Sequence, residues 1–314
     1  MEQQHRAAVQ NVDDLVGQTA LKTDIARWRD SRAVHGSKKI PDALLFHGPP
    51  GTGKTSSAVL IAKTLLGSLW FETNFIESNA SDDRGISYIR DELKQLMRVK
   101  PIGGGKKIIL LDEADGLTPA AQDALRRLIE KYSEHTMLIL TCNDLEKIRP
   151  AIRSRCAVYG FTPVDPVAGA KRLSDVYEIE HMDTLHRLVE LMHGDMRACI
   201  NFLDAAGDAY DTRVEQLESS LDDSVARALE GDWMRLRKNL HDSLKSGRPL
   251  PYVLTSFYDN IYEHFDDEDN LDSIWRMMAA YGDVLVHKHT WIGNEYSYLD
   301  YLVAKMKKEV EING

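Results

Sequence analysis

The stretch Ala43-Leu-Leu-Phe-His-Gly-Pro-Pro-Gly-Thr-Gly-Lys-Thr55 joins an apolar run to a glycine-rich loop. From Gly48 onward it fits the pattern G-x-x-x-x-G-K-S/T, in which a strand leads into a phosphate-binding loop and then a helix. Glycines let backbone N–H groups close around phosphate oxygens, and the N-terminus of the following helix adds partial positive charge. The stretch therefore predicts a site for ATP.

Each residue type in this loop has a chemical role in the prediction. Lys54 can reach the β- and γ-phosphates, and the hydroxyl of Thr55 can bind Mg²⁺. The residues expected to bind the nucleotide here are Gly48, Pro49, Pro50, Gly51, Thr52, Gly53, Lys54 and Thr55.

A second apolar run, Ile108-Ile-Leu-Leu-Asp-Glu113, ends in two carboxylates. A strand this apolar is buried on both faces of a parallel sheet, so acids at its carboxyl end reach the ligand-binding edge. Asp112 suits the Mg²⁺ shell, and Glu113 suits a general base that polarises an attacking water. A strand that simply ends in polar residues is the alternative. Beside an intact phosphate loop, the pair predicts hydrolysis of ATP.

Short β-rich runs alternate with helical patterns in the first half of the chain, which is typical of a parallel α/β sheet. The periodicity becomes helical after Pro163 and Pro166, which predicts domains at 1–163, 164–210 and 211–314. The expected strands are Ala43–His47, Asn74–Ser78, Lys107–Asp112, Met137–Cys142 and Ala157–Phe161. The expected helices of this half are Lys54–Leu66, Ile86–Arg98 and Pro119–Tyr132.

The composition is that of an ordinary soluble protein, with 43% hydrophobic and 28% charged residues among 314. The net charge of −10 disfavours a protein that coats nucleic acid with its whole surface, but a local basic face stays possible. Three separated cysteines predict neither a disulfide framework nor a zinc site. A secretory signal and a membrane-spanning run are not evident, so an intracellular location is expected.

On these motifs the chain resembles the AAA+ ATPases, and more closely the small subunits of replication factor C, a sliding-clamp loader of archaea, eukaryotes and viruses. The resemblance covers most of the chain, and Ser154-Arg-Cys156 is especially diagnostic. The motifs that carry it, besides the two already quoted, are Val16-Gly-Gln18, Asn79-Ala-Ser-Asp-Asp-Arg-Gly85, Pro101-Ile-Gly103, Leu111-Asp-Glu-Ala-Asp115, Ala121-Gln122, Ala124-Leu-Arg-Arg127, Thr141-Cys-Asn143, Gly194-Asp-Met-Arg197 and Asn294-Glu-Tyr-Ser-Tyr-Leu299.

This resemblance implies an AAA+ domain with a five-stranded parallel sheet, a small helical lid and an all-helical collar. It implies that Asn143 is the sensor 1 amide and that Arg197 is the sensor 2 arginine of the lid. It also implies that Arg155 is an arginine finger acting in trans on a neighbouring subunit, and that Val16 contacts the base. Without the resemblance, both arginines would first be taken as surface residues. The family's Glu-Lys-Tyr-Arg-Pro segment is absent near the N-terminus, which leaves the selectivity for adenine open.

A basic stripe is predicted on the helix that begins near Ile86, opposite a core face formed by Ile86, Ile89, Leu93 and Leu96. Arg90, Lys94 and Arg98 recur at i, i+4 and i+8, and Arg84 precedes them, as expected for contacts to DNA phosphates. Solvated charges balanced by Asp91 and Glu92 are the alternative. The segment Leu93–Ile102 is a candidate clamp contact from resemblance only.

The leading hypothesis is therefore an ATPase subunit of a clamp loader, with ATP and Mg²⁺ as cofactors. The resemblance implies as partners a PCNA-like sliding clamp, primer–template DNA and other loader subunits, in a homo- or hetero-oligomeric pentamer. Two alternatives are a catalytically silent structural subunit and another AAA+ machine, such as a helicase loader or a branch-migration motor. The sequence does not distinguish a cellular from a viral origin.

Overall fold

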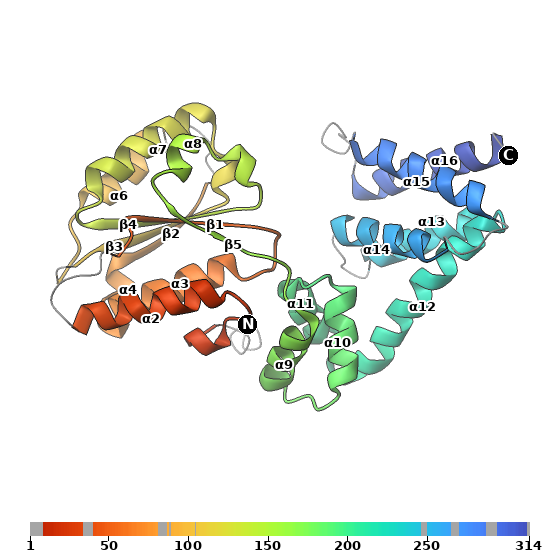
Figure 1. The fold of residues 1–314 in the computed structure, drawn as a ribbon, viewed down its shortest axis with the longest axis horizontal. Helices are drawn as coiled ribbons and strands as arrows, with labels where there is room; N and C mark the ends of the chain where they lie inside the picture. The colour runs from red at the N-terminus through yellow and green to blue at the C-terminus, as the bar shows by residue number, and fades with distance from the viewer. Residues whose placement is uncertain are drawn as a thin grey trace. The chain divides into compact units, whose positions relative to one another are not determined.

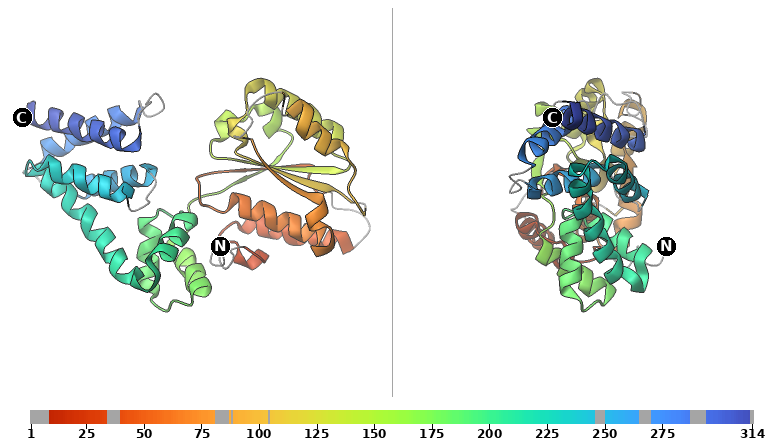
Figure 2. Two further views of the ribbon diagram at one scale, coloured as in Figure 1. Left: turned by 180° about the vertical axis from the view of Figure 1, so that it is seen from behind. Right: turned by 90° about the vertical axis from the view of Figure 1, so that its right-hand side faces the viewer.

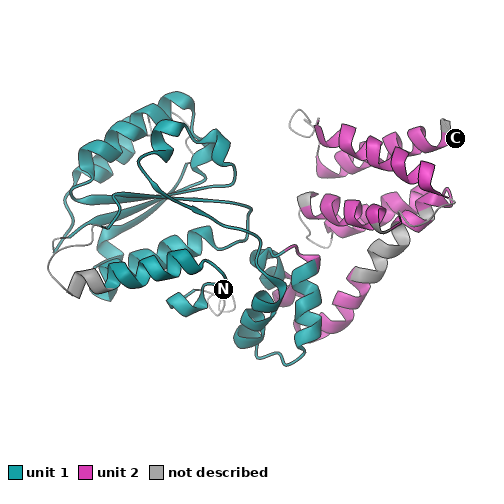
Figure 3. Cartoon of the chain, viewed as in Figure 1, with its two compact units in different colours: residues 1–190, 194–201 teal, residues 191–193, 202–314 magenta. Residues whose placement is uncertain are grey.

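The computed structural model describes residues 9–33, 40–80, 87, 89–103, 105–245, 250–264, 270–286 and 294–312 (Figure 1). Two compact units divide the chain, and the boundary falls within the helix that begins at Met196 (Figure 3). The first unit comprises residues 1–190 and 194–201, and the second comprises residues 191–193 and 202–314.

The first unit is built on a sheet of five parallel strands in the order β2-β3-β4-β1-β5. This confirms the predicted α/β architecture, with strand ends shifted by at most one residue. Asn74 belongs to a helix rather than to a strand, so β2 starts one residue later than predicted. The strands are β1 (Ala43–His47), β2 (Phe75–Asn79), β3 (Lys107–Asp112), β4 (Thr136–Cys142) and β5 (Ala157–Gly160).

Helices cover both faces of this sheet, as Figures 1 and 2 show. Because side chains of a strand alternate between faces, neighbouring residues of β1 join different cores. Leu45 packs in the cluster that contains Leu125 of α7 (Pro119–Tyr132). Leu44 packs in the cluster that contains Ile61 of α3 (Lys54–Leu66) and Trp28 of α2 (Thr19–Ala33). The sheet is therefore buried on both sides, which leaves its strand ends as the accessible edge.

The predicted helices 54–66 and 119–132 are present, whereas the pattern did not reveal α2 or the short α4. A seven-residue helix such as α4 is too short to display a period. The helical elements that accompany the sheet are η1 (Val12–Asp14), α2 (Thr19–Ala33), α3 (Lys54–Leu66), α4 (Ser68–Asn74), η2 (Ile89–Leu93), α6 (Lys94–Arg98), η3 (Ala114–Gly116), α7 (Pro119–Tyr132), η4 (Leu145–Lys147) and α8 (Pro150–Arg153).

The predicted helix 86–98 differs from expectation in its winding. Its first described turn, η2, is a π-helix that continues into α6, and Ile86 lies outside the described residues. Ile89, Leu93 and Met97 are buried, whereas Leu96 is only partly buried. A π turn holds more residues than an α turn, so it shifts the register of the residues that follow. Met97 thereby takes the core position expected for Leu96.

From Pro166 onward every described element is helical, as predicted. The second unit packs its helices around buried side chains that include Leu240, Phe257, Met277 and Leu299. None of the described helices combines the length and the apolar character required to cross a membrane. The helices of this half are α9 (Pro166–Tyr177), α10 (Met182–Leu191), α11 (Met196–Ala206), η5 (Gly207–Ala209), α12 (Tyr210–Leu229), α13 (Trp233–Lys245), α14 (Leu250–Glu263), α15 (Leu271–Val286) and α16 (Glu295–Ile312).

Candidate nucleotide-binding site

A cavity of about 590 Å³ opens at the carboxyl edge of the sheet, within the first unit. Its lining comes from the loop before α3, the ends of β3 and β4, the segment around η1, and helices α9 and α11. Of the predicted nucleotide ligands, the lining includes Val16, Pro50, Gly51, Thr52, Gly53, Lys54, Thr55, Asn143 and Arg197.

The loop between β1 and α3 curls around the ammonium group of Lys54. Lys54 Nζ donates hydrogen bonds to the carbonyl oxygens of Gly48 and Pro49, at 2.7 Å each. The Thr52 hydroxyl donates to the Pro49 carbonyl at 2.9 Å. Gly53 has a φ of 91°, a left-handed conformation that favours glycine just before the first turn of α3. These contacts hold the loop at the N-terminus of α3.

Lys54 also links the loop to the end of β4. Its Nζ donates to Asn143 Oδ1 at 3.0 Å. Burial lowers the pKa of Lys54 below the ordinary lysine value, although the carboxylate of Asp112 opposes this effect. A group that carries several negative charges, such as a triphosphate, would restore the stability of the ammonium form. The arrangement is therefore suited to binding phosphate.

The carboxylate of Asp112 is oriented by three neighbours at the end of β3. Thr55 Oγ1 donates to Asp112 Oδ2 at 3.0 Å, and the Thr141 hydroxyl donates to Asp112 Oδ1. The backbone N–H of Glu113 lies 3.2 Å from both Asp112 Oδ1 and Thr141 Oγ1. Glu113 itself has a positive φ of 54°, so the chain turns sharply there and Glu113 lines the cavity. Thr141 was not predicted as a site residue.

Asp115 holds the segment that carries Asn143. Its Oδ2 accepts the backbone N–H groups of Asn143 at 3.2 Å and Asp144 at 3.1 Å. In the sequence, Asp115 stands out only as the last residue of Asp-Glu-Ala-Asp, and that motif does not predict hydrogen bonds to the backbone of Asn143 and Asp144. The structure adds Asp115 as a residue that positions the Asn143 amide.

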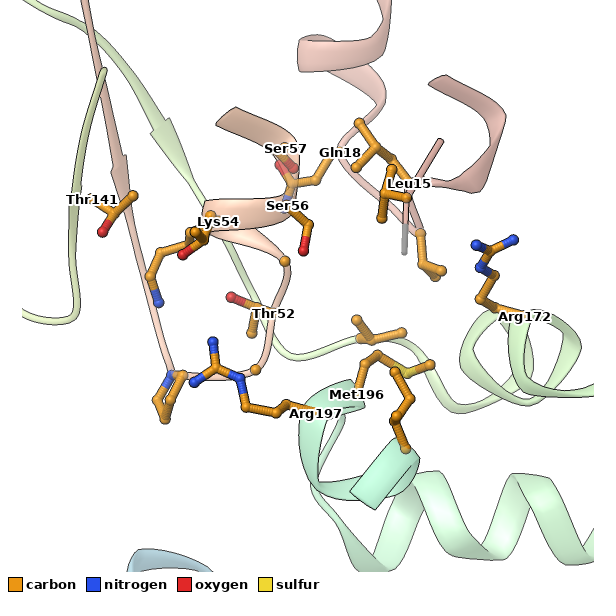
Figure 4. A pocket seen from close by; sticks show the side chains of 18 of the residues that line it. Leu15, Gln18, Thr52, Lys54, Ser56, Ser57, Thr141, Arg172, Met196 and Arg197 are labelled. Atoms are coloured by element: carbon orange, nitrogen blue, oxygen red, sulfur yellow. The ribbon is translucent and has the colours of Figure 1, made fainter. Parts of the chain in front are cut away.

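Helix α11 contacts the phosphate loop directly. The backbone N–H of Met196 donates to the Gly51 carbonyl at 3.1 Å. Asp195, just before the helix, accepts the N–H of Ala198 at 2.9 Å, and burial raises the pKa of its carboxyl above the ordinary value. Two residues later, Arg197 lines the cavity near Lys54 and Thr52 (Figure 4). The start of α11 and the phosphate loop therefore form one side of the site.

The other end of the cavity is mostly apolar and fits a nucleoside better than a phosphate chain. Figure 4 shows Leu15 and Arg172 there, away from Lys54 and Thr141. Arg172 and Asp14 form an ion pair with a nitrogen–oxygen distance of 2.8 Å. The sequence carries no local signal for this pair, because its members are 158 positions apart. The apolar lining of the cavity includes Val9, Leu15, Val16, Val164, Leu173, Val176, Met196 and Ile200.

Arg155 does not line the cavity of its own chain. It forms an ion pair with Glu130 of α7, and its guanidinium donates to the Ala151 carbonyl at 2.7 Å. The basic residues predicted to contact DNA also lie away from the cavity: Arg90, Lys94 and Arg98 are exposed along η2 and α6. Arg84 lies outside the described residues.

A parallel sheet with a phosphate loop, two strand-end carboxylates and an arginine-bearing helical segment defines an AAA-type ATPase domain. Residues 44–164 match the family described as "ATPase family associated with various cellular activities (AAA)". The chain is accordingly an ATP hydrolase that binds nucleotide. A solved structure of a RuvB point variant from Thermotoga maritima aligns with a TM-score of 0.54, covering 80% of this chain and 91% of that one. At 16% identity this likeness concerns the fold alone.

Sequence relatives give a more specific assignment. A replication factor C small subunit from Archaeoglobus fulgidus is 41% identical, covering 73% of this chain and 74% of the relative. One from Methanothermobacter thermautotrophicus is 38% identical, covering 74% and 70%. The chain belongs to the family of replication factor C small subunits.

Proposed function

We propose that this chain is an ATPase subunit of a DNA sliding-clamp loader, and that ATP binding and hydrolysis drive opening of the clamp and its loading onto primer–template DNA. One observation carries the proposal: each chain gathers Lys54, Asp112, Glu113 and Asn143 around its cavity, while its Arg155 lies elsewhere. A catalytic site completed by a neighbour's arginine suits a machine that works only when assembled. The membership of the family supports the same reading.

In this proposal Lys54 and the loop bind the phosphates of ATP, and Thr55 and Asp112 hold Mg²⁺. The two residues present hydroxyl and carboxylate oxygens 3.0 Å apart, and Mg²⁺ prefers oxygen ligands. When bound, the ion would neutralise phosphate charge. Glu113 would accept a proton from the attacking water, and the Asn143 amide would orient that water.

Two arginines, each from a different chain, would contact the phosphates of one ATP. Arg197 extends from α11 of the same chain, and Arg155 would reach the site of a neighbouring subunit. An arginine finger of this kind stabilises transition-state charge and is worth about 10³–10⁵ in rate. Other loader subunits are therefore proposed partners, in a pentamer of identical or different chains. Each such chain would consist of an AAA+ domain (1–163), a lid (164–210) and a collar (211–314).

DNA would contact the exposed basic stripe of η2 and α6. Arg90 lies on the π turn, and Lys94 and Arg98 lie on the α-helix. Each directly follows a buried residue in the sequence, namely Ile89, Leu93 and Met97. Phosphate contacts of this kind position DNA without reading its sequence. Such an interface is expected to weaken steeply as salt is raised.

The test is steady-state ATP hydrolysis by the assembled loader, with all partner subunits, with and without primed DNA and a PCNA-like clamp. Primed DNA and clamp together should stimulate the wild-type rate, and Lys54→Ala should abolish that stimulation. Lys63→Ala, an exposed lysine on the same helix, is the matched control and should behave as wild type. No stimulation of the complete assembly would reject the clamp-loader function.

A further inference from the structure

The N-terminal segment that reaches the cavity is organised by Asp14. Its Oδ2 accepts the backbone N–H groups of Gln10 and Asn11, at 2.8 Å each. The next residue, Leu15, is buried in the core cluster that contains Leu21 and Trp28 of α2. The carboxylate of Asp14 is thereby fixed to the body of the first unit at the rim of the cavity.

The other oxygen of this carboxylate binds α9. Arg172 Nη1 donates to Asp14 Oδ1 at 2.8 Å, with side-chain exposures of 19% for Arg172 and 21% for Asp14. Leu15 and Leu173, the residues next to the two partners, both line the cavity. The ion pair therefore connects the two apolar walls between which a nucleoside would lie.

Two of the contacts in the described part of the chain tie the helical segment to the sheet-bearing body beside the cavity. One is the backbone hydrogen bond between Gly51 and Met196 at the phosphate loop. The other is the Asp14–Arg172 pair, which lies beside the apolar lining (Figure 4 labels Arg172 and Leu15 there). The pair is made by side chains alone, so it can break by rotation about side-chain bonds, without unfolding of α9 or η1.

We propose that the Asp14–Arg172 ion pair is a clasp that closes the nucleoside end of the cavity and limits the rate at which nucleotide leaves. This inference rests on ATP binding in the cavity, as in the proposed function, and not on clamp loading. Hydrogen bonds from the backbone of Asn11 and Gln10 and the nearby Arg172 outweigh the effect of burial and lower the pKa of Asp14, which keeps the carboxylate charged at neutral pH. At neutral pH both side chains are therefore charged, as the closed ion pair requires.

The experiment measures release of a fluorescent methylanthraniloyl derivative of ATP from the full chain with Mg²⁺, by stopped flow with excess unlabelled ATP as the chase. Asp14→Asn keeps an oxygen for the two backbone N–H groups but loses the charge, and Arg172→Gln loses the partner charge. Each is expected to accelerate release about tenfold, which corresponds to ~1.4 kcal/mol. The double variant should release no faster than either single variant, because the same contact is already lost.

The matched control is the Lys106–Asp42 pair, which has a similar exposure of 29% and 30% and a separation of 2.6 Å, and does not line the cavity. Lys106→Gln should leave release unchanged. Arg172→Lys, which keeps the positive charge, should release nucleotide more slowly than Arg172→Gln. In the wild type, raising the salt concentration should speed release, and this effect should be much smaller in the double variant.

Unchanged release in both single variants, or a double variant whose acceleration equals the product of the two, would overturn the clasp. Arg172→Lys provides a second variant should Arg172→Gln fail to fold, and an equal salt dependence in the wild type and the double variant would also overturn the clasp. A wild-type chain that does not bind the fluorescent nucleotide would contradict both the clasp and the proposed ATPase. A loader that hydrolyses ATP without stimulation by DNA and clamp would contradict only the proposed function.

Discussion

Gly51 and Gly67 have almost the same φ angle but very different surroundings. Their φ angles are +71° and +72°, in the left-handed region that favours glycine. A Cβ on Gly51 would collide with the carboxylate of Asp195, whereas a Cβ on Gly67 would meet no atom within 4 Å. The glycine of the phosphate loop is therefore required by a neighbour as well as by its own φ.

Alanine substitutions at these two positions should distinguish the cost of backbone strain from the cost of a collision with Asp195. Gly67→Ala is expected to lower the free energy of unfolding by about 1–3 kcal/mol, because its φ of 72° and ψ of 165° form a conformation that L-residues rarely adopt. Gly51→Ala should cost more and should also weaken ATP binding, since the loop or α11 must shift. Urea unfolding and titration with ATP measure the two effects. Equal losses of stability with unchanged ATP affinity would show that Asp195 does not constrain the loop.

Helices α9 and α11 begin with the same device. Asp165 accepts the N–H of Ala168 at 3.0 Å, and Asp195 accepts the N–H of Ala198 at 2.9 Å. Such caps satisfy backbone donors that have no partner within the helix. Only α11 presents an arginine, Arg197, to the phosphate end of the cavity from its first turn. The two caps therefore use the same hydrogen bond, but only the cap of α11 helps to position an arginine at the cavity.

Asp195→Ala and Asp165→Ala should each cost about 0.5–2 kcal/mol of stability. Only Asp195→Ala is expected to weaken ATP binding, by roughly three- to tenfold, because a frayed first turn misplaces Arg197. Asp195→Asn retains a good cap and removes a negative charge beside the phosphates, so it should bind ATP at least as tightly as wild type. ATP affinity that falls equally in both alanine variants would contradict a positioning role for Asp195.

At the scale of the whole molecule, Arg155 is held by Glu130 of its own chain, and the proposed role in trans requires that it leave this partner. The ion pair is partly exposed, with side-chain exposures of 32% and 44%, so its contribution to stability is small, at about 0–1 kcal/mol. The proposed move of Arg155 from Glu130 to a phosphate group of a neighbouring subunit would therefore cost little. Under the proposed function, assembly rather than folding would therefore complete the catalytic site.

Mixing two inactive variants tests this view. Arg155→Ala keeps its own phosphate loop but lacks the finger, and Lys54→Ala keeps the finger but cannot hold phosphate. Each alone should lose about 10³-fold or more in turnover, and assemblies that contain both should recover part of the wild-type rate. Arg153→Ala, which breaks a nearby pair with Glu146, is the control and should remain active. If mixed assemblies stay inactive, a role of Arg155 in trans is contradicted.

The sequence alone determined the sheet, its helices 54–66 and 119–132, and the phosphate loop with its acids, because these features depend on patterns within a few residues. Glycine spacing, apolar runs and strand-end carboxylates carry that information locally. The start of β2 and the register of η2 and α6 were wrong by one residue, since packing overrode the local pattern. The predicted roles of Arg155 and Arg197 and the DNA contacts stay predictions.

Only the tertiary structure decided which distant side chains meet. Thr141 and Thr55 orient Asp112, Asp115 holds the segment of Asn143, and Asp14 pairs with Arg172 across 158 positions of sequence. No local pattern specifies these partners. The contacts of Asp112 and Asp115 exist only after strands from separate parts of the chain align in one parallel sheet and their carboxyl ends meet at one edge. The Asp14–Arg172 pair exists only because α9 lies beside η1. The local sequence therefore predicts the phosphate-binding loop, whereas the Asp14–Arg172 pair beside the cavity follows only from the tertiary structure.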